Sequence, residues 1–472
     1  MHTGEVALKW IDDHRSELTN LSDKVWSYAE LHLREFNSAD AQIACIKKQG
    51  FDVKVEIAGM PTAFIATWGS GRPIIGFLGE FDALPGCSNE AAPVRKEVAP
   101  GGSGHACGHN LLGVAALAAA VAMKEELARS GASGTVRYYG CPAEEYYGGK
   151  AFMAREGGLL DDLDACLTWH PGSMNMVRGG SSLAVIGVKF HFHGRTAHAA
   201  GSPHHGRSAL DAVEIMNVGV NYLREHIIEK ARIHYVITNG GMAPNVVPAE
   251  ATVWYFIRAP QNDQLEELFA RVKKCAEGAA HMTETTHEVE LGNALANVLS
   301  NKTLEKVLEI AMKQAGPPKW TEEDHAFARE IAKTFAPGQL DTAVREEGLP
   351  AELQTQVLNT TIVPKPTIPP SGRGSTDVGD ASWVAPTAQF SMACQALGTP
   401  GHSWQVTAQS GMGIGHAGMI AAARTLVLAG LYLADHPDVV KAAREEFEQT
   451  TAGRKYKCMM PPELKPPLFS RK

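Results

Sequence analysis

Residues 73–86 read PIIGFLGEFDALPG. The first seven residues form an uninterrupted apolar run, and a short run of this kind predicts a strand that is buried on both faces of a sheet. Two carboxylates, Glu80 and Asp82, follow where this strand should end. A buried strand that runs into ionisable residues is typical of an α/β sheet whose functional site lies beyond the carboxyl ends of its strands.

Two later strands are predicted to repeat this pattern. A second strand of the buried type, over 135–141, leads to the pair Glu144 and Glu145, and a third, over 165–168, leads to His170. Three strands that each end in ionisable side chains predict an α/β fold in which those side chains gather at one edge of the sheet.

Cys107 and His109 stand two residues apart on a glycine-flanked turn. A thiol and an imidazole at this spacing can both face one metal ion. Asn110 is a candidate N-cap for a helix over 111–129, which Gly131 would close. The turn would then lie at a helix N-terminus, where the helix dipole favours thiolate over thiol.

The side chains at the ends of the predicted elements suffice for a metal site. Two ions about 3.5–4 Å apart use four to six ligands and a further carboxylate that handles protons. On a turn, the neighbours Glu144 and Glu145 point in different directions, so one can coordinate while the other faces a metal-bound water. The alternative from the same stretch is a cysteine hydrolase with Cys107 as nucleophile and His109 or His105 as base. The candidate set is Cys107, His109, Glu144, Glu145, His170 and His402.

The pattern changes after residue 181. Strands over 185–193, 234–238, 251–257 and about 287–291, with helices over 208–229 and 264–280, follow in the order β-α-β-β-α-β. This order is that of a two-layer sandwich of the ferredoxin-like type. We therefore expect a catalytic domain of residues 1–181 and 295–472 and an inserted domain of residues 182–294, with the apolar helix 210–223 as a dimerisation surface.

The remaining elements belong to the larger domain. Residues 1–50 are predicted to be helical and residues 51–67 to form strands. Residues 317–373 are rich in Pro, Glu and Thr and are interpreted as a surface excursion with one helical piece. Further elements are predicted as a helix over 301–314, a strand over 389–395 and a helix over 417–434, before a charged, then proline-rich tail after 438.

Composition excludes several classes of protein. The 472 residues carry a net charge of −8, so no basic surface for nucleic acid is expected. The apolar run 111–123 is too short to cross a bilayer, and the run 417–434 carries Arg424 and is interpreted as a buried helix. The eight cysteines show no framework spacing, which is typical of reduced thiols, and no targeting segment is visible. We expect a cytoplasmic protein with no membrane partner.

Four motifs follow one another in a recognisable order: GEFDALP at 79–85, HACGH at 105–109, PAEE at 142–145 and GRTAHA at 194–199. This order resembles the M20 metallopeptidases, in the amidohydrolase branch whose first site carries Cys-Gly-His. Within that branch, the chain is similar to the group of aminobenzoyl-glutamate hydrolase B subunits. The similarity lies in the surface excursion, the segments 374–380 and 401–403 and the proline-rich tail. The resemblance covers essentially the whole chain.

The resemblance implies a mixed-sheet catalytic domain, an inserted lid or dimerisation domain, and one or two Zn(II) or Mn(II) ions per subunit. It implies that Glu144 is the general base and that His198 crosses from the partner subunit to stabilise the oxyanion. Asn245 and Arg258 match residues that contact the carboxylate of the substrate. Glu80 and Asn110 depart from the family pattern near the second metal position. The implied metal ligands are Cys107, His109, Glu145, His170 and His402.

The activity implied by the resemblance is metal-dependent hydrolysis of the amide bond of N-acyl amino acids, with aminobenzoyl-glutamate or a similar conjugate as substrate. A dipeptidase or aminoacylase of another M20 specificity is an alternative. A further alternative is a subunit that needs a different chain for activity. The assembly is expected to be a homodimer or a heteromer with a related subunit.

Overall fold

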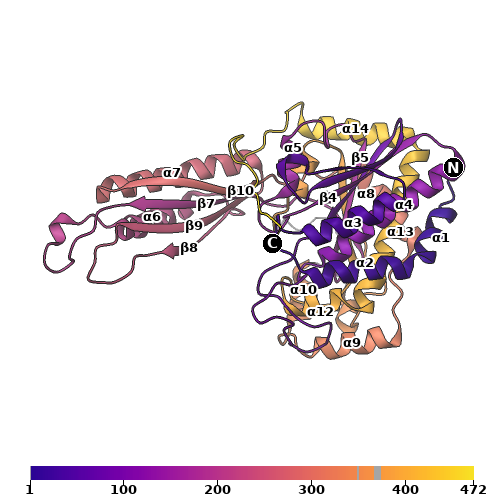
Figure 1. The fold of residues 1–472 in the computed structure, drawn as a ribbon, viewed down its shortest axis with the longest axis horizontal. Helices are drawn as coiled ribbons and strands as arrows, with labels where there is room; N and C mark the ends of the chain where they lie inside the picture. The colour runs from indigo at the N-terminus through magenta and orange to yellow at the C-terminus, as the bar shows by residue number, and fades with distance from the viewer. Residues whose placement is uncertain (1, 348–349, 366–373, 472) are drawn as a thin grey trace.

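The computed structural model describes residues 2–347, 350–365 and 374–471. The molecule has a larger body and an elongated smaller part that extends away from it (Figure 1). The body contains a seven-stranded sheet and the smaller part a four-stranded sheet. The predicted α/β class with an inserted α+β unit is confirmed.

The seven-stranded sheet is mixed and runs in the order β1-β2-β4-β3-β5-β11-β6. Strands β4, β3, β5 and β11 are parallel to their neighbours in this run, and the outer strands pair antiparallel. The carboxyl ends of the four parallel strands therefore meet at one edge. The strands are β1 Asp52–Val55, β2 Phe64–Ser70, β3 Ile74–Glu80, β4 Gly134–Cys141, β5 Ala165–Gly172, β6 Met176–Arg178 and β11 Thr387–Ala393.

Two long apolar helices, α4 (His109–Ser130) and α13 (Gly413–Asp435), pack against each other and against the sheet. By length and composition α13 could cross a membrane, but 83% of its apolar window is buried inside the protein. It is a core helix, as its sequence predicts. The other helices of the body are α1 Glu5–Asp13, α2 Arg15–Tyr28, α3 Phe36–Lys48, α5 Gly149–Arg155, α8 Lys302–Ala315, α9 Glu322–Ala332, α10 Gln339–Glu347, α11 Val378–Ser382, α12 Trp404–Ser410 and α14 Pro437–Thr451.

The smaller part, called the lid below, has the predicted β-α-β-β-α-β order, and its sheet runs β10-β7-β9-β8 with antiparallel pairs throughout. Its two helices contact each other and pack on the sheet, which buries the β9 side chains Val253, Tyr255 and Ile257. The alternate residues Trp254, Phe256 and Arg258 are only half-buried. The elements are β7 Ala184–His193, α6 Ala209–Leu223, β8 Arg232–Asn239, β9 Glu250–Ala259, α7 Asn262–Thr283 and β10 Thr286–Leu295.

The predicted N-cap of the central helix is wrong. Helix α4 begins at His109, and its N-cap is Gly108 with φ 77°. A left-handed backbone suits glycine far better than asparagine, so the chain turns into the helix before Asn110 is reached. The Asn110 amide instead donates to Ser22 Oγ and to the Ser410 carbonyl. Gly131 closes the helix with φ 67°, as predicted.

Among the described residues, five helices of the body were absent from the prediction: α5, α10, α11, α12 and α14. Helix α14 lies in the stretch interpreted as a charged tail, and it buries only Ala443 and Thr451. Helix α10 lies in the predicted excursion, part of which, 366–373, is outside the described residues. Charged and polar residues outnumber apolar ones in both α10 and α14, so neither helix stands out from the polar stretch around it in the sequence. The predicted helix 208–229 is also shorter, because α6 ends at Leu223.

Candidate metal centre

The carboxyl edge of the large sheet collects the predicted ligand-type side chains. Glu80 ends β3, Glu144 and Glu145 follow β4, and His170 lies near the end of β5. Cys107 and His109 come from the turn that opens α4, and His402 comes from the loop between β11 and α12. Strands far apart in the sequence therefore deliver these groups to one place.

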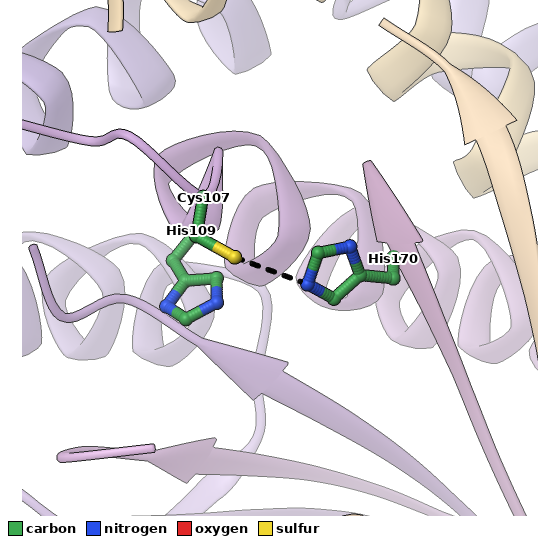
Figure 2. Close-up of side chains that lie close together, drawn as sticks. All are labelled: Cys107, His109 and His170. Carbon is green, nitrogen blue, oxygen red and sulfur yellow. Dashed lines mark hydrogen bonds between the residues drawn. The ribbon is translucent and has the colours of Figure 1, made fainter. Parts of the chain in front are cut away.

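Two groups of side chains share Cys107. The sulfur of Cys107 lies 3.2 Å from Nε2 of His170, and Figure 2 shows both side chains beside His109. One ligand atom from each of Cys107, His109 and His170 lies within 4.8 Å of the others, and the same holds for Cys107, Glu145 and His402. His402 is more open, with Nε2 3.6 Å from Glu145 Oε2. The structure thus brings the five implied ligands together, in two groups joined by one thiol.

The donor atoms of this cluster fit a cation. Nε2 of His109, Oε2 of Glu80 and Oε1 of Glu145 are buried and have no hydrogen-bond partner in the described part of the chain. A buried polar atom without a partner costs about 1–3 kcal/mol. Several such atoms that face one another, with a thiol beside them, make the nitrogen, oxygen and sulfur environment that Zn(II) and similar ions prefer.

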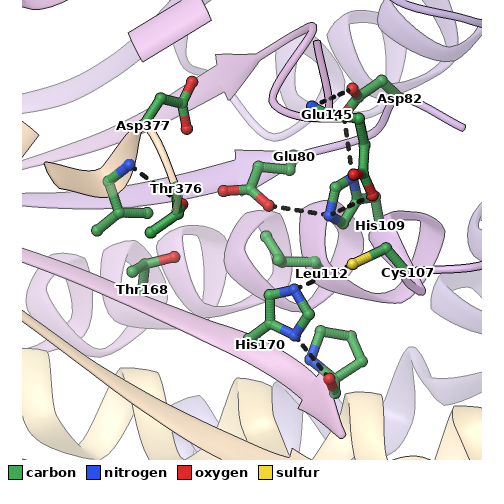
Figure 3. A network of polar contacts seen from close by, with 12 residues as sticks. Glu80, Asp82, Cys107, His109, Leu112, Glu145, Thr168, His170, Thr376 and Asp377 are labelled. Atoms are coloured by element: carbon green, nitrogen blue, oxygen red, sulfur yellow. Dashed lines mark hydrogen bonds and ion pairs between the residues drawn. The ribbon is translucent and has the colours of Figure 1, made fainter. Parts of the chain in front are cut away.

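Asp82 orients the cluster. Its Oδ1 lies 2.9 Å from His109 Nδ1, and its Oδ2 accepts the backbone N–H of Glu145 at 3.0 Å. His109 therefore has Nε2 free for the centre, and Figure 3 shows that nitrogen between Glu80 and Glu145. A carboxylate behind a ligating histidine fixes the ring and strengthens metal binding. His170 is held similarly, with Nδ1 2.6 Å from the Pro171 carbonyl.

Glu144 has the environment of a general base. It is half-buried, and one of its oxygens lies within 4.8 Å of ligand-type atoms of Glu80 and His109. Burial, together with the carboxylates of Glu80 and Glu145, raises the pKa of Glu144 well above its ordinary value. A carboxylate whose pKa is raised toward neutrality can accept a proton from water and then donate it.

The cysteine-hydrolase alternative finds little support in this geometry. Burial raises the pKa of the Cys107 thiol, and the neighbouring Glu145 carboxylate adds to the rise. A nucleophilic cysteine needs the opposite shift. His105, one candidate base, is buried with Nε2 3.0 Å from the Val25 carbonyl. A cation next to Cys107 would offset the negative charges of both the Cys107 thiolate and the Glu145 carboxylate.

The lid residues implied by the resemblance lie at opposite ends of the lid. His198 and Asn245 are exposed in the loops next to His193 and Glu250, which pair at the end away from the body. Strand β7 has 10 residues, so this end lies roughly 30 Å from the body end of the lid sheet. Arg258 is at the near end, where its Nη1 donates to Ser375 Oγ at 2.8 Å. His198 and Asn245 thus do not join the cluster of their own chain.

A residue that sequence reasoning missed supports the Glu144 turn. Glu35 is fully buried, and it accepts the Ala143 backbone N–H at 3.0 Å and the Thr62 hydroxyl at 2.9 Å. Ala143 has φ 59°, a left-handed conformation that is unfavourable for alanine. The Glu35 carboxyl group therefore helps to hold the strained turn that presents Glu144 and Glu145. Nothing in the local sequence of Glu35 signals this role.

Glu35 predicts a pH dependence of stability. Burial and the charge of Asp82 raise the pKa of Glu35 from 4.5 to about 8. Between these values the unfolded chain has lost the proton and the folded chain keeps it, so the free energy of unfolding falls as the pH rises. We expect Glu35→Gln to remove the contribution of Glu35 to this fall in the free energy of unfolding. Denaturant titrations of metal-free protein between about pH 5 and 8 would measure it. The exposed control Glu323→Gln should follow the wild type, and identical slopes for all three proteins would contradict the assignment.

Comparison with known proteins agrees with the fold. A family model described as the M20 peptidase dimerisation domain matches residues 183–283. The B subunit of p-aminobenzoyl-glutamate hydrolase from Escherichia coli (strain K12) is 43% identical, over 97% of this chain and 98% of that protein. The A subunit of p-aminobenzoyl-glutamate hydrolase from the same strain is 29% identical, over 49% of this chain and 56% of that protein. A Bacillus subtilis structure, described as a dinuclear metal-binding peptidase from the M20 family, has a TM-score of 0.56 at 16% identity, and the match covers 90% of this chain and 99% of that one.

The α/β fold with its inserted lid and the ligand-type side chains at the strand ends agree with the relatives, which indicate a hydrolase that acts on amide bonds. The chain belongs to the M20 family of peptidases and amidohydrolases. The resemblance seen in the sequence motifs is confirmed. The matched dimerisation segment lies within the predicted inserted domain.

Proposed function

We propose that this chain hydrolyses the amide bond of aroyl-amino acids, with p-aminobenzoyl-glutamate as the substrate, and that one or two divalent cations, Zn(II) or Mn(II), are held by Cys107, His109, Glu145, His170 and His402. The observation that carries the proposal is the convergence of these side chains, with buried donor atoms that lack hydrogen-bond partners. The similarity to the Escherichia coli B subunit along nearly the whole chain supports the substrate class.

The cation, Glu144 and Asp82 have separate roles in the proposed hydrolysis. A bound cation supplies polarisation of the scissile carbonyl and a lower pKa for its water. Glu144 accepts the proton of the attacking water and delivers it to the leaving nitrogen, which its raised pKa permits. Asp82 keeps the His109 ring in one orientation throughout.

The substrate's carboxylate end is assigned to the lid. Arg258 lies near the body on the face of β9 that the lid helices do not cover, and it is half-buried there. Its guanidinium group can pair with a carboxylate of the substrate. Because His198 and Asn245 lie at the far end of the lid, we propose that they act on the site of a second protomer. That protomer is a copy of this chain or a related chain, as the similarity to the Escherichia coli A subunit suggests.

The test of this function is a substrate panel with the purified chain alone. We expect hydrolysis of p-aminobenzoyl-glutamate and benzoyl-glutamate in preference to N-acetyl amino acids and dipeptides. A preference for dipeptides would overturn the proposed substrate class in favour of a dipeptidase. Turnover that appears only after a second, related chain is added would show that the active assembly is a heteromer.

Sharing of the site between protomers predicts complementation. His198→Ala should lower kcat about 10²- to 10³-fold, because an oxyanion donor is lost. When the His198→Ala and Glu144→Gln chains are co-expressed, half of the random dimers have one complete site, so about a quarter of wild-type activity should return. The matched control, His198→Ala co-expressed with the double variant, should stay inactive. Failure of the first pair to recover would mean that His198 does not act in trans.

We also propose that the protein works in the cytoplasm. All eight cysteines lie in the described residues, and each is a free thiol. Reduced thiols in such number suit a reducing compartment. Fractionation of cells that produce the native protein would test this, and recovery outside the cytoplasm would contradict it.

A further inference from the structure

A buried lysine lies directly behind the candidate metal centre. Lys150, in the first turn of α5, has 0% of its side chain exposed, and no other lysine is buried among the described residues. Its Nζ lies 2.6 Å from Oε1 of Glu80 and 2.5 Å from Oδ1 of Asp377. The Lys150 backbone N–H also donates to Oδ2 of Asp377 at 2.8 Å. Burial of an ammonium group costs desolvation free energy, which the ion pairs with Glu80 and Asp377 offset. Lys150, Glu80 and Asp377 therefore form a fixed cluster in the fold.

Glu80 lies between the lysine and the centre. One of its oxygens is held by Lys150, and the other is 3.2 Å from His109 Nε2 with no hydrogen bond in the described part of the chain. Figure 3 shows the Glu80 carboxylate between Asp377 and His109. Glu80 is therefore the carboxylate that contacts both Lys150 and the His109 side of the centre.

The imidazole of His109 can serve only one ion. Its Nδ1 is engaged by Asp82, which leaves Nε2. Two groups of side chains require that atom: Cys107 with His109 and His170, and Glu80 with His109 and Glu144. An ion in the second group would take Glu144 as a ligand and remove the proposed base. It would also share Glu80 with the Lys150 ammonium, and like charges a few ångströms apart in a buried site repel strongly.

We infer that Lys150 is a positioning residue that holds Glu80 out of metal coordination, which directs the ion of His109 to the Cys107 side and leaves Glu144 free as the base. This inference rests on the metal centre proposed above. It assigns a role to Glu80, where the chain departs from the motif of other M20 branches.

Two double variants test the inference as a matched pair. With all three groups ionised, Lys150, Glu80 and Asp377 have a net charge of −1, and Lys150→Met alone would leave two carboxylates without a counter-ion. Lys150→Met with Asp377→Asn, and Lys150→Met with Glu80→Gln, both restore that charge and remove the same ammonium. Only the first retains a carboxylate at position 80 that is free to capture the ion.

Each protein would be loaded with Co(II), and thiolate-to-Co(II) absorption per bound ion would be recorded, with Zn(II) affinity measured by chelator competition. For Lys150→Met/Asp377→Asn we expect weaker thiolate absorption and a change in Zn(II) affinity of about 10- to 100-fold. We also expect kcat to fall while KM stays close to the wild-type value. Lys150→Met/Glu80→Gln should keep the wild-type spectrum.

Equal spectra and affinities for the two double variants would overturn the role of Lys150. Wild-type protein that binds Co(II) without thiolate absorption would instead contradict Cys107 as a ligand, and hence the proposed centre itself. The two failures are therefore distinguishable.

Discussion

Replacement of Glu144 with glutamine is expected to lower kcat by about 10²- to 10⁴-fold, the range for loss of a general acid–base group, while bound metal stays at the wild-type level. Glutamine keeps the size of the side chain but cannot accept the proton of an attacking water. Glu144 lies beside the two groups that share Cys107 but belongs to neither, so its loss should not empty the centre. Steady-state kinetics and metal analysis of the same preparation measure both effects.

The neighbouring residue supplies the control. Glu145→Gln removes a carboxylate from the group with Cys107 and His402, so activity and metal should fall together. If Glu144→Gln lost metal in parallel with activity, Glu144 would be a ligand and not the base. Retention of full activity by Glu144→Gln would remove it from the mechanism.

Replacement of Cys107 with alanine is expected to have the largest effect on metal binding. The sulfur of Cys107 is common to both groups of implied ligands, so its removal weakens each of them. The loss of Zn(II) affinity should exceed the roughly 100-fold that removal of a ligand-orienting group produces, and hydrolysis should fall with metal occupancy. Chelator competition gives the affinity, and titration with Zn(II) shows how far activity returns.

Cys45→Ala is the matched control, because this thiol is also partly exposed but lies on α3, outside both groups. It should bind metal as the wild type does. A Cys107→Ala protein that kept its metal and lost activity, together with inactivation of the wild type by iodoacetamide, would restore the cysteine-hydrolase alternative.

The position of the centre could be predicted because it depends on local patterns. The stretches before Glu80, Glu144 and His170 predict buried strands, and parallel strands place their carboxyl ends at one edge. Their convergence with Cys107 and His109 follows from that topology. The individual roles of His198, Asn245 and Arg258 came only from the resemblance, because neither an exposed loop residue nor a single arginine near a strand end has a sequence pattern that reveals its chemistry.

The partners of the centre could not be predicted. Glu35 contacts Ala143 from 108 residues away, and Lys150 contacts Asp377 from 227 residues away. Such pairs depend on how distant elements pack, and a motif that contains one partner, such as PAEE at 142–145, does not identify the other. The packing of α14 on α8 likewise joins elements that are far apart in the sequence.

The central claim is that the chain holds divalent cations at the Cys107 centre and needs them for amide hydrolysis. The most direct measurement is metal content by elemental mass spectrometry of protein purified without added metal or chelator, with hydrolysis of p-aminobenzoyl-glutamate followed in the same samples. About one or two equivalents of Zn or Mn, lost on chelation together with activity and restored with it, is the predicted result. Activity that survives complete removal of metal, or no binding even after reconstitution, would contradict the account.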